Sequence, residues 1–370
     1  MKRIAIVHDY LIDFGGAERV LLALHEIYPE APIYVLIYRK ASLGHFGSKF
    51  DDARVIQSWF GRLPFADKII SPLRFLIPGI WKSINLKEYD LIISSSSWAV
   101  AKGFDKKPGE KEICYCHTPP RYLYGYDTSR KFAGLMGKLV KIYGSIVNRF
   151  MRKYDFKRAQ KVDYFIANSQ EVAGRIQKFY HRDSAVIYPP IEIPDSRFQI
   201  PNSKNYFLAG GRLVASKNFD LIIKTFNKLG LPLKFYGSGP ACESLKEIAG
   251  PSVEILGRVS DEELSELYAG ALAYVLAEKD EDFGMTPVEA MGFGTPVIAY
   301  RGGGYLESIV EGKTGVFFDE LTVESLSDAI QKFEKMKFNS EDCITQARKF
   351  SSVRFKKEIK EFVGVHTEQG

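Results

Sequence analysis

A chain of 370 residues is too long for the usual single hydrophobic core, so we expect two domains. Apolar residues make up 45% of the chain and charged residues 26%, which is typical of a soluble globular enzyme and excludes disordered and fibrous classes. The net charge is +6, and residues 1–188 hold 30 basic against 18 acidic side chains, which predicts an anionic surface or substrate for the first half.

Neither a membrane span nor a signal peptide is indicated. A spanning helix needs about 20 apolar residues, and charged side chains interrupt every apolar stretch well before that length. The apolar run Ile4–Val7 stops at His8, too early for the core of a signal peptide. Four cysteines without C-x-x-C spacing predict neither a disulfide framework nor a zinc site. We therefore expect a cytoplasmic protein with reduced cysteines.

The first half alternates short apolar strands with helical stretches. Charged or turn residues bound each apolar run, as is typical of buried parallel strands. The predicted strands are Ile4–Val7, Ile33–Tyr38, Leu91–Ser94, Ile113–His117 and Tyr164–Ala167. We expect them to form an N-terminal domain over residues 1–188.

Two places in this half follow predicted strands and are candidate ligand sites. Gly15 and Gly16 open a helix after the first strand, and such a pair lets a ligand approach the helix N-terminus. The segment lacks G-x-G-x-x-G, and a plain tight turn explains it nearly as well. His117 ends a later strand, at the carboxyl edge where ligands of α/β folds bind, although a structural histidine is the alternative. His8 and Asp9 occupy the equivalent end of the first strand.

Two segments of the first half are basic and amphipathic. Residues 130–161 hold ten basic side chains against one acidic side chain, and apolar residues recur at helical spacing at Leu135, Leu139, Ile142, Ile146 and Phe150. Residues 62–87 combine basic side chains with Phe65, Phe75, Ile77, Ile80 and Trp81. Such segments can lie on an anionic membrane, and the alternative is a core-facing helix with a wetted basic side. No nucleic-acid recognition motif accompanies the charge, so we expect a membrane surface and no nucleic acid.

A second domain follows a linker. After Tyr188, a stretch rich in Pro, Asp, Asn and Ser continues neither helix nor strand, so we expect a linker over residues 189–205. The next predicted strands are Tyr206–Ala209, Leu233–Tyr236, Val253–Leu256, Leu272–Leu276, Pro296–Ala299 and Val316–Phe318. We expect a C-terminal domain over residues 206–345 and a C-terminal helix over 346–370 that returns to the N-terminal domain. The pattern predicts two doubly wound α/β domains.

Basic residues follow the first strand of the second domain. The turn Gly210–Gly211 lets backbone approach a ligand at the carboxyl end of that strand. Arg212 can bind two phosphate oxygens at once, and Lys217 can add a point charge. Together they predict a diphosphate site, and the alternative is a solvated pair on a loop.

The strongest cluster is Glu281–Glu289, between a predicted strand and a helix. Thr286, Pro287 and Glu289 fit the N-cap, first and third positions of that helix, so Glu289 can be interpreted as the partner of a capping box. The other interpretation is a ligand site. The free amides at a helix N-terminus bind phosphate, and Glu281 can accept hydrogen bonds from sugar hydroxyls.

The same loop contains an acidic D-x-D at Asp280 and Asp282, a pattern that holds divalent metals in other enzymes. Alone it is a weak signal, and an acidic surface loop is the alternative. No metal is needed where Arg212 and Lys217 neutralise a diphosphate.

Six different motifs follow one another along the chain, at Gly15–Arg19, His117–Pro119, Gly211–Arg212 with Lys217, Gly237–Pro240, Gly257–Ser260 and Glu281–Glu289. Together they resemble family 4 of the retaining GT-B glycosyltransferases, through essentially the whole chain. The stretch Cys114–Leu123 is most similar to bacterial mannosyltransferases of polysaccharide and O-antigen assembly. This resemblance implies an α/β GT-B fold, in which two doubly wound Rossmann-like domains face a central cleft.

The resemblance also implies roles for individual residues. Arg212 and Lys217 would hold the donor diphosphate. Glu281 would bind the donor sugar hydroxyls and Glu289 the ribose. The remaining donor contacts and the residues lining the reaction centre would be Arg258, Val259, Phe283, Gly284, Met285, Gly16, Asp9 and His117.

The activity implied is transfer of a hexose, with mannose from GDP-mannose as the expected donor, to a hydroxyl of a lipid-linked or polysaccharide acceptor. The anomeric configuration would be retained, and no metal or other cofactor is expected. The enzyme would act at the inner face of the cell membrane. Two alternatives stay open: a GT-B sugar-nucleotide epimerase, and a catalytically silent membrane-bound partner of a glycan-assembly complex.

Overall fold

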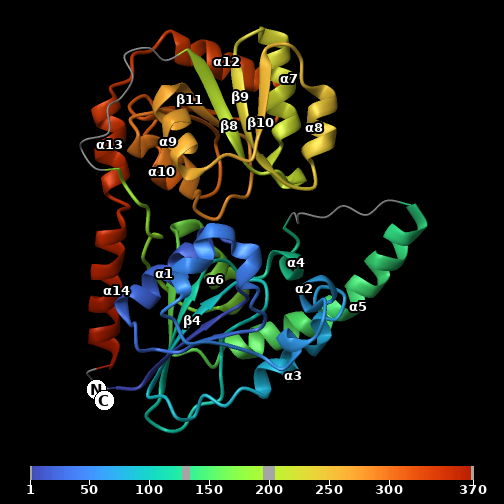
Figure 1. The fold of residues 1–370 in the computed structure, drawn as a ribbon, viewed down its shortest axis with the longest axis vertical. Coiled ribbons are helices and arrows are strands. Elements are labelled where there is room, and N and C mark those ends of the chain that lie inside the picture. The colour runs from blue at the N-terminus through green and yellow to red at the C-terminus, as the bar shows by residue number, and fades with distance from the viewer. Residues whose placement is uncertain (1, 127–133, 195–204, 368–370) are drawn as a thin grey trace. The chain divides into compact units, whose positions relative to one another are not determined.

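The computed structural model describes residues 2–126, 134–194 and 205–367, and the side chains of residues 134–141 are not among those described. The described residues divide into two compact units, each a parallel β-sheet with helices around it (Figure 1). The first comprises 2–126, 134–190 and 352–367, and the second 191–194 and 205–351. Most of the predicted linker, residues 195–204, lies outside the described ranges.

The sheet of the first unit has seven strands in the order β3-β2-β1-β4-β5-β6-β7, and all pairings are parallel. The strands are β1 Ile4–His8, β2 Ile33–Val35, β3 Val55–Gln57, β4 Leu91–Ser96, β5 Lys111–Cys116, β6 Tyr164–Ala167 and β7 Ala185–Val186. Successive residues point to opposite faces, and both faces are covered, so Ile6 enters one core cluster while Val7 enters another. This double burial explains why each predicted strand is a continuous apolar run.

Helices cover both faces of this sheet. They are α1 Gly16–Ile27, α2 Ala66–Ile69, α3 Ile77–Lys82, α4 Arg121–Tyr124, α5 Gly134–Ala159, α6 Gln170–Tyr180 and α14 Ser352–Thr367, with 3-10 turns at Lys40–Phe50, Phe60–Arg62 and Arg74–Leu76. The last helix, α14, packs beside α1 and buries Phe355, Ile359 and Val363, which are spaced four residues apart, in the core of the first unit. Both ends of the described chain therefore contribute to one core.

A buried ion pair joins α5 to the loop after β4. Lys102 Nζ lies 2.5 Å from Asp155 Oδ1, and these side chains are 1% and 0% exposed. The Tyr124 hydroxyl donates to Asp155 Oδ2 at 2.7 Å, and Lys102 Nζ lies 5.0 Å from the centre of the Tyr180 ring. The pair thus ties four separate segments of the first unit together.

The second sheet has six parallel strands in the order β10-β9-β8-β11-β12-β13. Its strands are β8 Tyr206–Arg212, β9 Leu233–Ser238, β10 Val253–Gly257, β11 Ala271–Leu276, β12 Val297–Tyr300 and β13 Gly315–Phe318. Its helices are α7 Phe219–Leu229, α8 Cys242–Ile248, α9 Asp261–Gly270, α10 Met285–Gly292, α11 Tyr305–Ser308, α12 Val323–Glu334 and α13 Ser340–Arg348, with a 3-10 turn at Ala215–Lys217. All strands predicted for this half are present.

Each sheet reverses its strand order at one point. In the first unit the reversal lies between β1 and β4, and in the second between β8 and β11. Ligands of open α/β sheets bind outside the carboxyl ends of the strands at such reversals. Ligand sites are therefore expected in the segments that follow β1 and β4, and in those that follow β8 and β11.

Candidate functional site

A lysine lies between two carboxylates at the reversal point of the second sheet. Lys217 closes the 3-10 turn after β8, and its Nζ lies 3.2 Å from Glu278 Oε2 and 3.6 Å from Glu281 Oε2. Burial alone would lower the pKa of Lys217, but the two carboxylates outweigh burial and raise it above its usual value. Lys217 is therefore a fixed cation at the carboxyl ends of β8 and β11.

Glu278 is a site residue that the sequence analysis missed. It is 5% exposed and follows β11 by two residues, so it belongs to the same sheet edge as Lys217. Its position directly after a predicted strand could have identified Glu278, but the prediction was based on the nearby Glu281–Glu289 motif instead. Buried acidic side chains are uncommon unless paired, and here the partner is Lys217.

The acidic loop is fixed by a glycine turn and a tyrosine. Gly304 N–H donates to the Glu281 carbonyl at 3.0 Å, and a Cβ on Gly304 would lie 2.3 Å from Phe283 Cα, so only glycine fits there. The Tyr305 hydroxyl donates to Glu281 Oε2 at 3.5 Å. The ring of Phe283 is buried against Phe350, so this residue anchors the loop through its side chain.

The capping-box interpretation of Glu289 is wrong. Helix α10 begins at Met285, and its N-cap is Gly284, whose φ of 82° is a left-handed conformation that favours glycine. Thr286 is then the second helical residue and Glu289 the fifth, too far along the helix to bond the N-cap amide.

A chain of buried hydroxyls links Glu289 to the end of β8. The Tyr268 hydroxyl donates to Glu289 Oε2 at 3.4 Å, and Tyr236 lies between Tyr268 and Tyr274, with O···O distances of 3.0 and 3.2 Å. The Tyr274 hydroxyl donates to the Gly210 carbonyl at 2.9 Å. Burial raises the pKa of Tyr268 above its usual value, so this hydroxyl keeps its proton and can donate.

The other predicted donor residues lie further apart. Arg212 is exposed at the end of β8, close in sequence to Lys217. Arg258 and Val259 follow β10, the outermost strand on that side of the sheet, and Arg258 is exposed. Asp280 and Asp282 are half-buried, and among the described residues no group of three or more His, Cys, Asp or Glu side chains is arranged to hold a metal ion.

The reversal point of the first sheet gathers His8, Asp9, Ser95 and His117. His117 lies one residue beyond β5, which ends at Cys116 rather than at His117, and its Nε2 lies 2.8 Å from Ser95 Oγ. Asp9 is 2% exposed and accepts hydrogen bonds from the amide and hydroxyl of Ser97, both at 2.8 Å. Asp9 therefore holds the loop after β4 in place. A role for Asp9 in lining the side of the site that binds the acceptor substrate stays a prediction. Gly16 is the exposed first residue of α1.

Two family models match this chain, one after the other. "Glycosyltransferase Family 4" matches residues 14–193 and "Glycosyl transferases group 1" matches residues 192–350. The chain belongs to the group 1 / family 4 glycosyltransferases. The first model covers the unit with the His8–His117 cluster, and the second covers the unit with Lys217.

Two relatives with named activities are similar to this chain. It is 26% identical over 370 residues to the sulfoquinovosyl transferase SQD2 of Arabidopsis thaliana, covering 95% of this chain and 63% of that protein. It is 31% identical over 204 residues to the O-antigen chain mannosyltransferase RfbU of Salmonella typhimurium, covering 50% and 57%. The chain thus spans less than two thirds of either relative.

The fold of this chain is shared with a solved structure, the sucrose-phosphate synthase of Thermosynechococcus elongatus. The TM-score is 0.71 at 16% identity, over 100% of both chains. The predicted α/β fold with two Rossmann-like domains is therefore confirmed. Within the described ranges, no helix combines the length and apolar character that crossing a bilayer requires.

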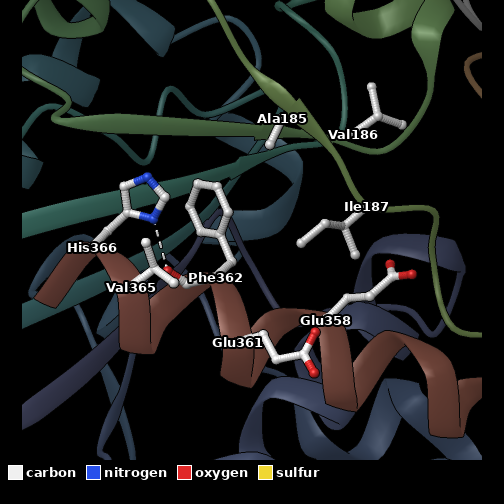
Figure 2. A pocket seen from close by; sticks show the side chains of 8 residues that line it. All are labelled: Ala185, Val186, Ile187, Glu358, Glu361, Phe362, Val365 and His366. Carbon is white, nitrogen blue, oxygen red and sulfur yellow. Dashed lines mark hydrogen bonds between the residues drawn. The ribbon is translucent and has the colours of Figure 1, made fainter. Parts of the chain in front are cut away.

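A shallow hollow of about 340 Å³ lies elsewhere on the first unit, between β7 and α14 (Figure 2). It is lined by Ala185, Val186, Ile187, Glu358, Glu361, Phe362, Val365 and His366. None of the predicted site residues lines it. The His366 ring in this hollow is turned back on its own helix, with Nδ1 bonded to the Phe362 carbonyl at 2.8 Å.

Glu289→Gln should separate ligand binding from structure. The amide keeps the size of the side chain, and its oxygen can still accept from Tyr268, so the free energy of unfolding should change little. If Glu289 binds the donor ribose, losing a charged hydrogen bond should weaken donor binding about tenfold or more. Calorimetric titration with the donor measures this effect. Unchanged affinity together with unchanged stability would return Glu289 to a structural role.

His117 should make the stability of the first unit depend on pH. Burial, together with nearby His8, lowers the pKa of His117 from 6.5 to about 3. Between these values the unfolded chain binds a proton that the native residue does not, so this stability is complete above pH 6.5 and is lost as pH falls towards 3. We expect a loss of up to about 1.4 kcal/mol per pH unit. Denaturant melts check this, and equal pH slopes for wild type and His117→Gln would contradict it.

Proposed function

We propose that this glycosyltransferase transfers a hexose, mannose from GDP-mannose, to a hydroxyl of a lipid-linked or polysaccharide acceptor, with retention at the anomeric carbon. The observation that carries the proposal is the Lys217 cation, held between Glu278 and Glu281 at the reversal point of the second sheet. A nucleotide diphosphate needs a cation, and a sugar needs carboxylate acceptors for its hydroxyls. The similarity to an O-antigen chain mannosyltransferase supports mannose as the sugar.

The mechanism that we propose for this transfer uses two basic side chains and one carboxylate of the second unit. The acceptor oxygen bonds to the anomeric carbon as the bond from that carbon to the diphosphate oxygen breaks, and the acceptor proton passes to the departing phosphate. Arg212 and Lys217 neutralise the charge that grows on this leaving group, which is the largest contribution expected from the protein. Glu281 orients the sugar through its hydroxyls. No step needs a covalent bond between sugar and protein.

We also propose that the transfer needs no metal. Two basic side chains, Arg212 and Lys217, can neutralise the diphosphate, and the D-x-D at Asp280 and Asp282 then has no ligand role. Activity should persist in EDTA. Loss of activity in EDTA that manganese or magnesium restores would overturn this assignment.

The test of the proposed function is a panel of nucleotide sugars, assayed for binding and for turnover. A ligand that binds only the native state raises the melting temperature, and GDP-mannose should give the largest rise. Turnover without acceptor then separates the alternatives, because an epimerase releases the free epimer whereas a transferase gives at most slow hydrolysis. A larger shift with another nucleotide sugar would replace mannose, and no shift with any of them would favour the silent partner.

We further propose that the first unit binds an anionic membrane through the exposed side of α5. Ile142, Ile146 and Phe150 are 61, 69 and 52% exposed, so the alternative of a core-facing apolar side is wrong for these three. The side of α5 that faces the core is formed instead by Val147 and Met151. An exposed apolar row with basic neighbours is the pattern of helices that lie on membranes.

The second basic segment adjoins α5. Arg74 Nε donates to Asn148 Oδ1 at 3.0 Å, and the Arg74 guanidinium lies 5.4 Å from the centre of the Tyr143 ring. In this segment Phe65 and Phe75 are 66 and 42% exposed. Three other residues predicted to belong to the surface, Ile77, Ile80 and Trp81, are buried in the core. They lie three and four residues apart along α3, so they share the side of this short helix that packs into the core.

Vesicle binding should depend on both the apolar row and the charge. Ile142→Ser, Ile146→Ser and Phe150→Ser together should abolish co-sedimentation with anionic vesicles, because they remove the exposed apolar area that would enter the membrane. Wild-type binding should also fall steeply with salt, since the Debye length shrinks from about 10 Å at 0.1 M to about 3 Å at 1 M.

The matched control is Val353→Ser, which changes a 79% exposed apolar side chain on α14 of the same unit. It should leave vesicle binding unchanged. Arg149→Glu with Lys153→Glu, both exposed on α5, should weaken binding to anionic vesicles only. Equal binding to neutral and anionic vesicles, or binding to neither, would contradict the membrane proposal.

A further inference from the structure

Four buried side chains form a continuous row at the reversal point of the first sheet. Glu18 Oε1 lies 3.6 Å from His8 Nε2, His8 Nδ1 lies 2.9 Å from Ser95 Oγ, and Ser95 Oγ lies 2.8 Å from His117 Nε2. Their exposed fractions are 5, 2, 0 and 8%. His8 and Ser95 are direct partners in the β1–β4 register, so the sheet itself fixes their separation.

The hydrogens along this row can be counted from the Glu18 end. An ionised carboxylate only accepts hydrogen bonds, and Glu18 Oε2 already accepts from the Gly15 amide at 2.8 Å. Glu18 Oε1 lies 3.6 Å from His8 Nε2, which is longer than a hydrogen bond, but the negative carboxylate repels a bare nitrogen lone pair, so the single hydrogen of a neutral His8 is favoured on Nε2. In a neutral His8 the other nitrogen, Nδ1, is then bare and accepts from the Ser95 hydroxyl.

The same count continues to His117. The Ser95 hydroxyl has one hydrogen, and it is used toward His8, so the Ser95 oxygen accepts from His117 Nε2–H. Because burial holds the pKa of His117 near 3, its ring is neutral and carries only that one hydrogen. Nδ1 of His117 is then an acceptor without a hydrogen, and no bond to it from the described residues is recorded.

The other polar groups around this row have partners of their own. The Asp9 carboxylate accepts from Ser97 and from the Ala101 amide at 3.2 Å. The Tyr115 ring lies 5.3 Å from the His117 ring, and the Tyr115 hydroxyl donates to the Ile187 carbonyl at 2.9 Å. The direction of the hydrogens is therefore decided at the Glu18 end.

We infer that Glu18, His8 and Ser95 are positioning residues that hold His117 in the Nε2–H tautomer, so that its Nδ1 accepts a hydrogen bond from a sugar hydroxyl of the substrate. The identity of that hydroxyl group as part of a sugar rests on the proposed function, whereas the tautomer does not. A site built to accept from a hydroxyl discriminates strongly against an analogue that lacks it. The row would thus give the first unit a part in substrate selection.

The tautomer can be observed without substrate. In protein labelled with nitrogen-15 in its histidines, two-bond correlation spectra distinguish a bare imidazole nitrogen from a protonated one. Wild type should show His117 with Nε2 protonated and Nδ1 bare. Ser95→Ala removes the acceptor of that hydrogen, so His117 should shift to a mixture of tautomers. A wild-type His117 protonated at Nδ1, or an unchanged tautomer in Ser95→Ala, would overturn the inference.

A matched control and a conservative variant separate positioning from packing. Ser96→Ala removes a buried hydroxyl from the next residue of the same strand, and should leave the His117 signals unchanged, because that hydroxyl has no hydrogen-bond partner among the described residues. Ser95→Thr keeps the hydroxyl and should restore the wild-type tautomer. Ser95→Ala should also lower kcat/KM about tenfold, the scale of one hydrogen bond. Absent transferase activity with the expected tautomer would count against the proposed function alone.

Discussion

Replacing Lys217 by alanine should lower turnover at saturating donor by about a hundredfold or more. That is the scale for losing one group that stabilises charge in the transition state. The leaving diphosphate would lose its point charge, and Glu278 and Glu281 would lose the cation that lies between them. Steady-state kinetics on the purified variant measure the effect, with a thermal melt to confirm that the protein is folded.

Lys224→Ala is the matched control for this variant. Lys224 belongs to the same unit, but it is exposed on α7 and pairs with the exposed Asp220 at 2.9 Å. Exposed pairs of this kind contribute about 0–1 kcal/mol, so both turnover and stability should be close to wild type. Wild-type turnover in folded Lys217→Ala would remove the diphosphate role from Lys217.

Breaking the Lys102–Asp155 pair should cost the first unit about 3–5 kcal/mol of its free energy of unfolding. In Lys102→Met the Asp155 carboxylate stays fully buried and loses its cation, while the Tyr124 hydroxyl still donates to it. Because net stabilities are commonly about 5–15 kcal/mol, a loss of this size should lower the midpoint of chemical denaturation clearly.

The double variant Lys102→Met, Asp155→Leu tests the cause of that loss. Removing both charges leaves no uncompensated carboxylate, and apolar replacements of buried pairs are often neutral or stabilising. The double variant should therefore recover most of the stability. If it is no more stable than Lys102→Met, lost packing rather than an unpaired charge explains the effect.

The strands were predictable because burial on both faces makes each one a continuous apolar run. The exceptions are β3 and β7, at the two edges of the first sheet, with three and two residues. Edge strands this short have no distinct apolar pattern, so nothing in the sequence separates them from loops. Strand order, and with it the two reversal points, depends on pairings between residues far apart in the chain.

The candidate site was predictable where a motif places its residues after a strand, as for Lys217 and His117. Glu278, Ser95 and Tyr268 were missed because each takes part in the site through a contact with a side chain that is distant in the sequence, and only the fold brings the two together. The helix over α5 was predicted from its spacing, but spacing alone does not say which side a helix buries. Here a narrow row at Val147 and Met151 packs inward, and the more apolar row faces out.

The return of α14 to the first unit has a consequence for how the protein is made. A ribosome releases the sheet of the first unit early, but Phe355, Ile359 and Val363, which cover one of its faces beside α1, emerge only after the whole of the second unit. The second unit, contained within residues 191–351, can close its own core before then. Nascent chains should therefore pass through a stage in which the later unit is folded and the earlier one still exposes apolar surface, which is the stage at which chaperones would act.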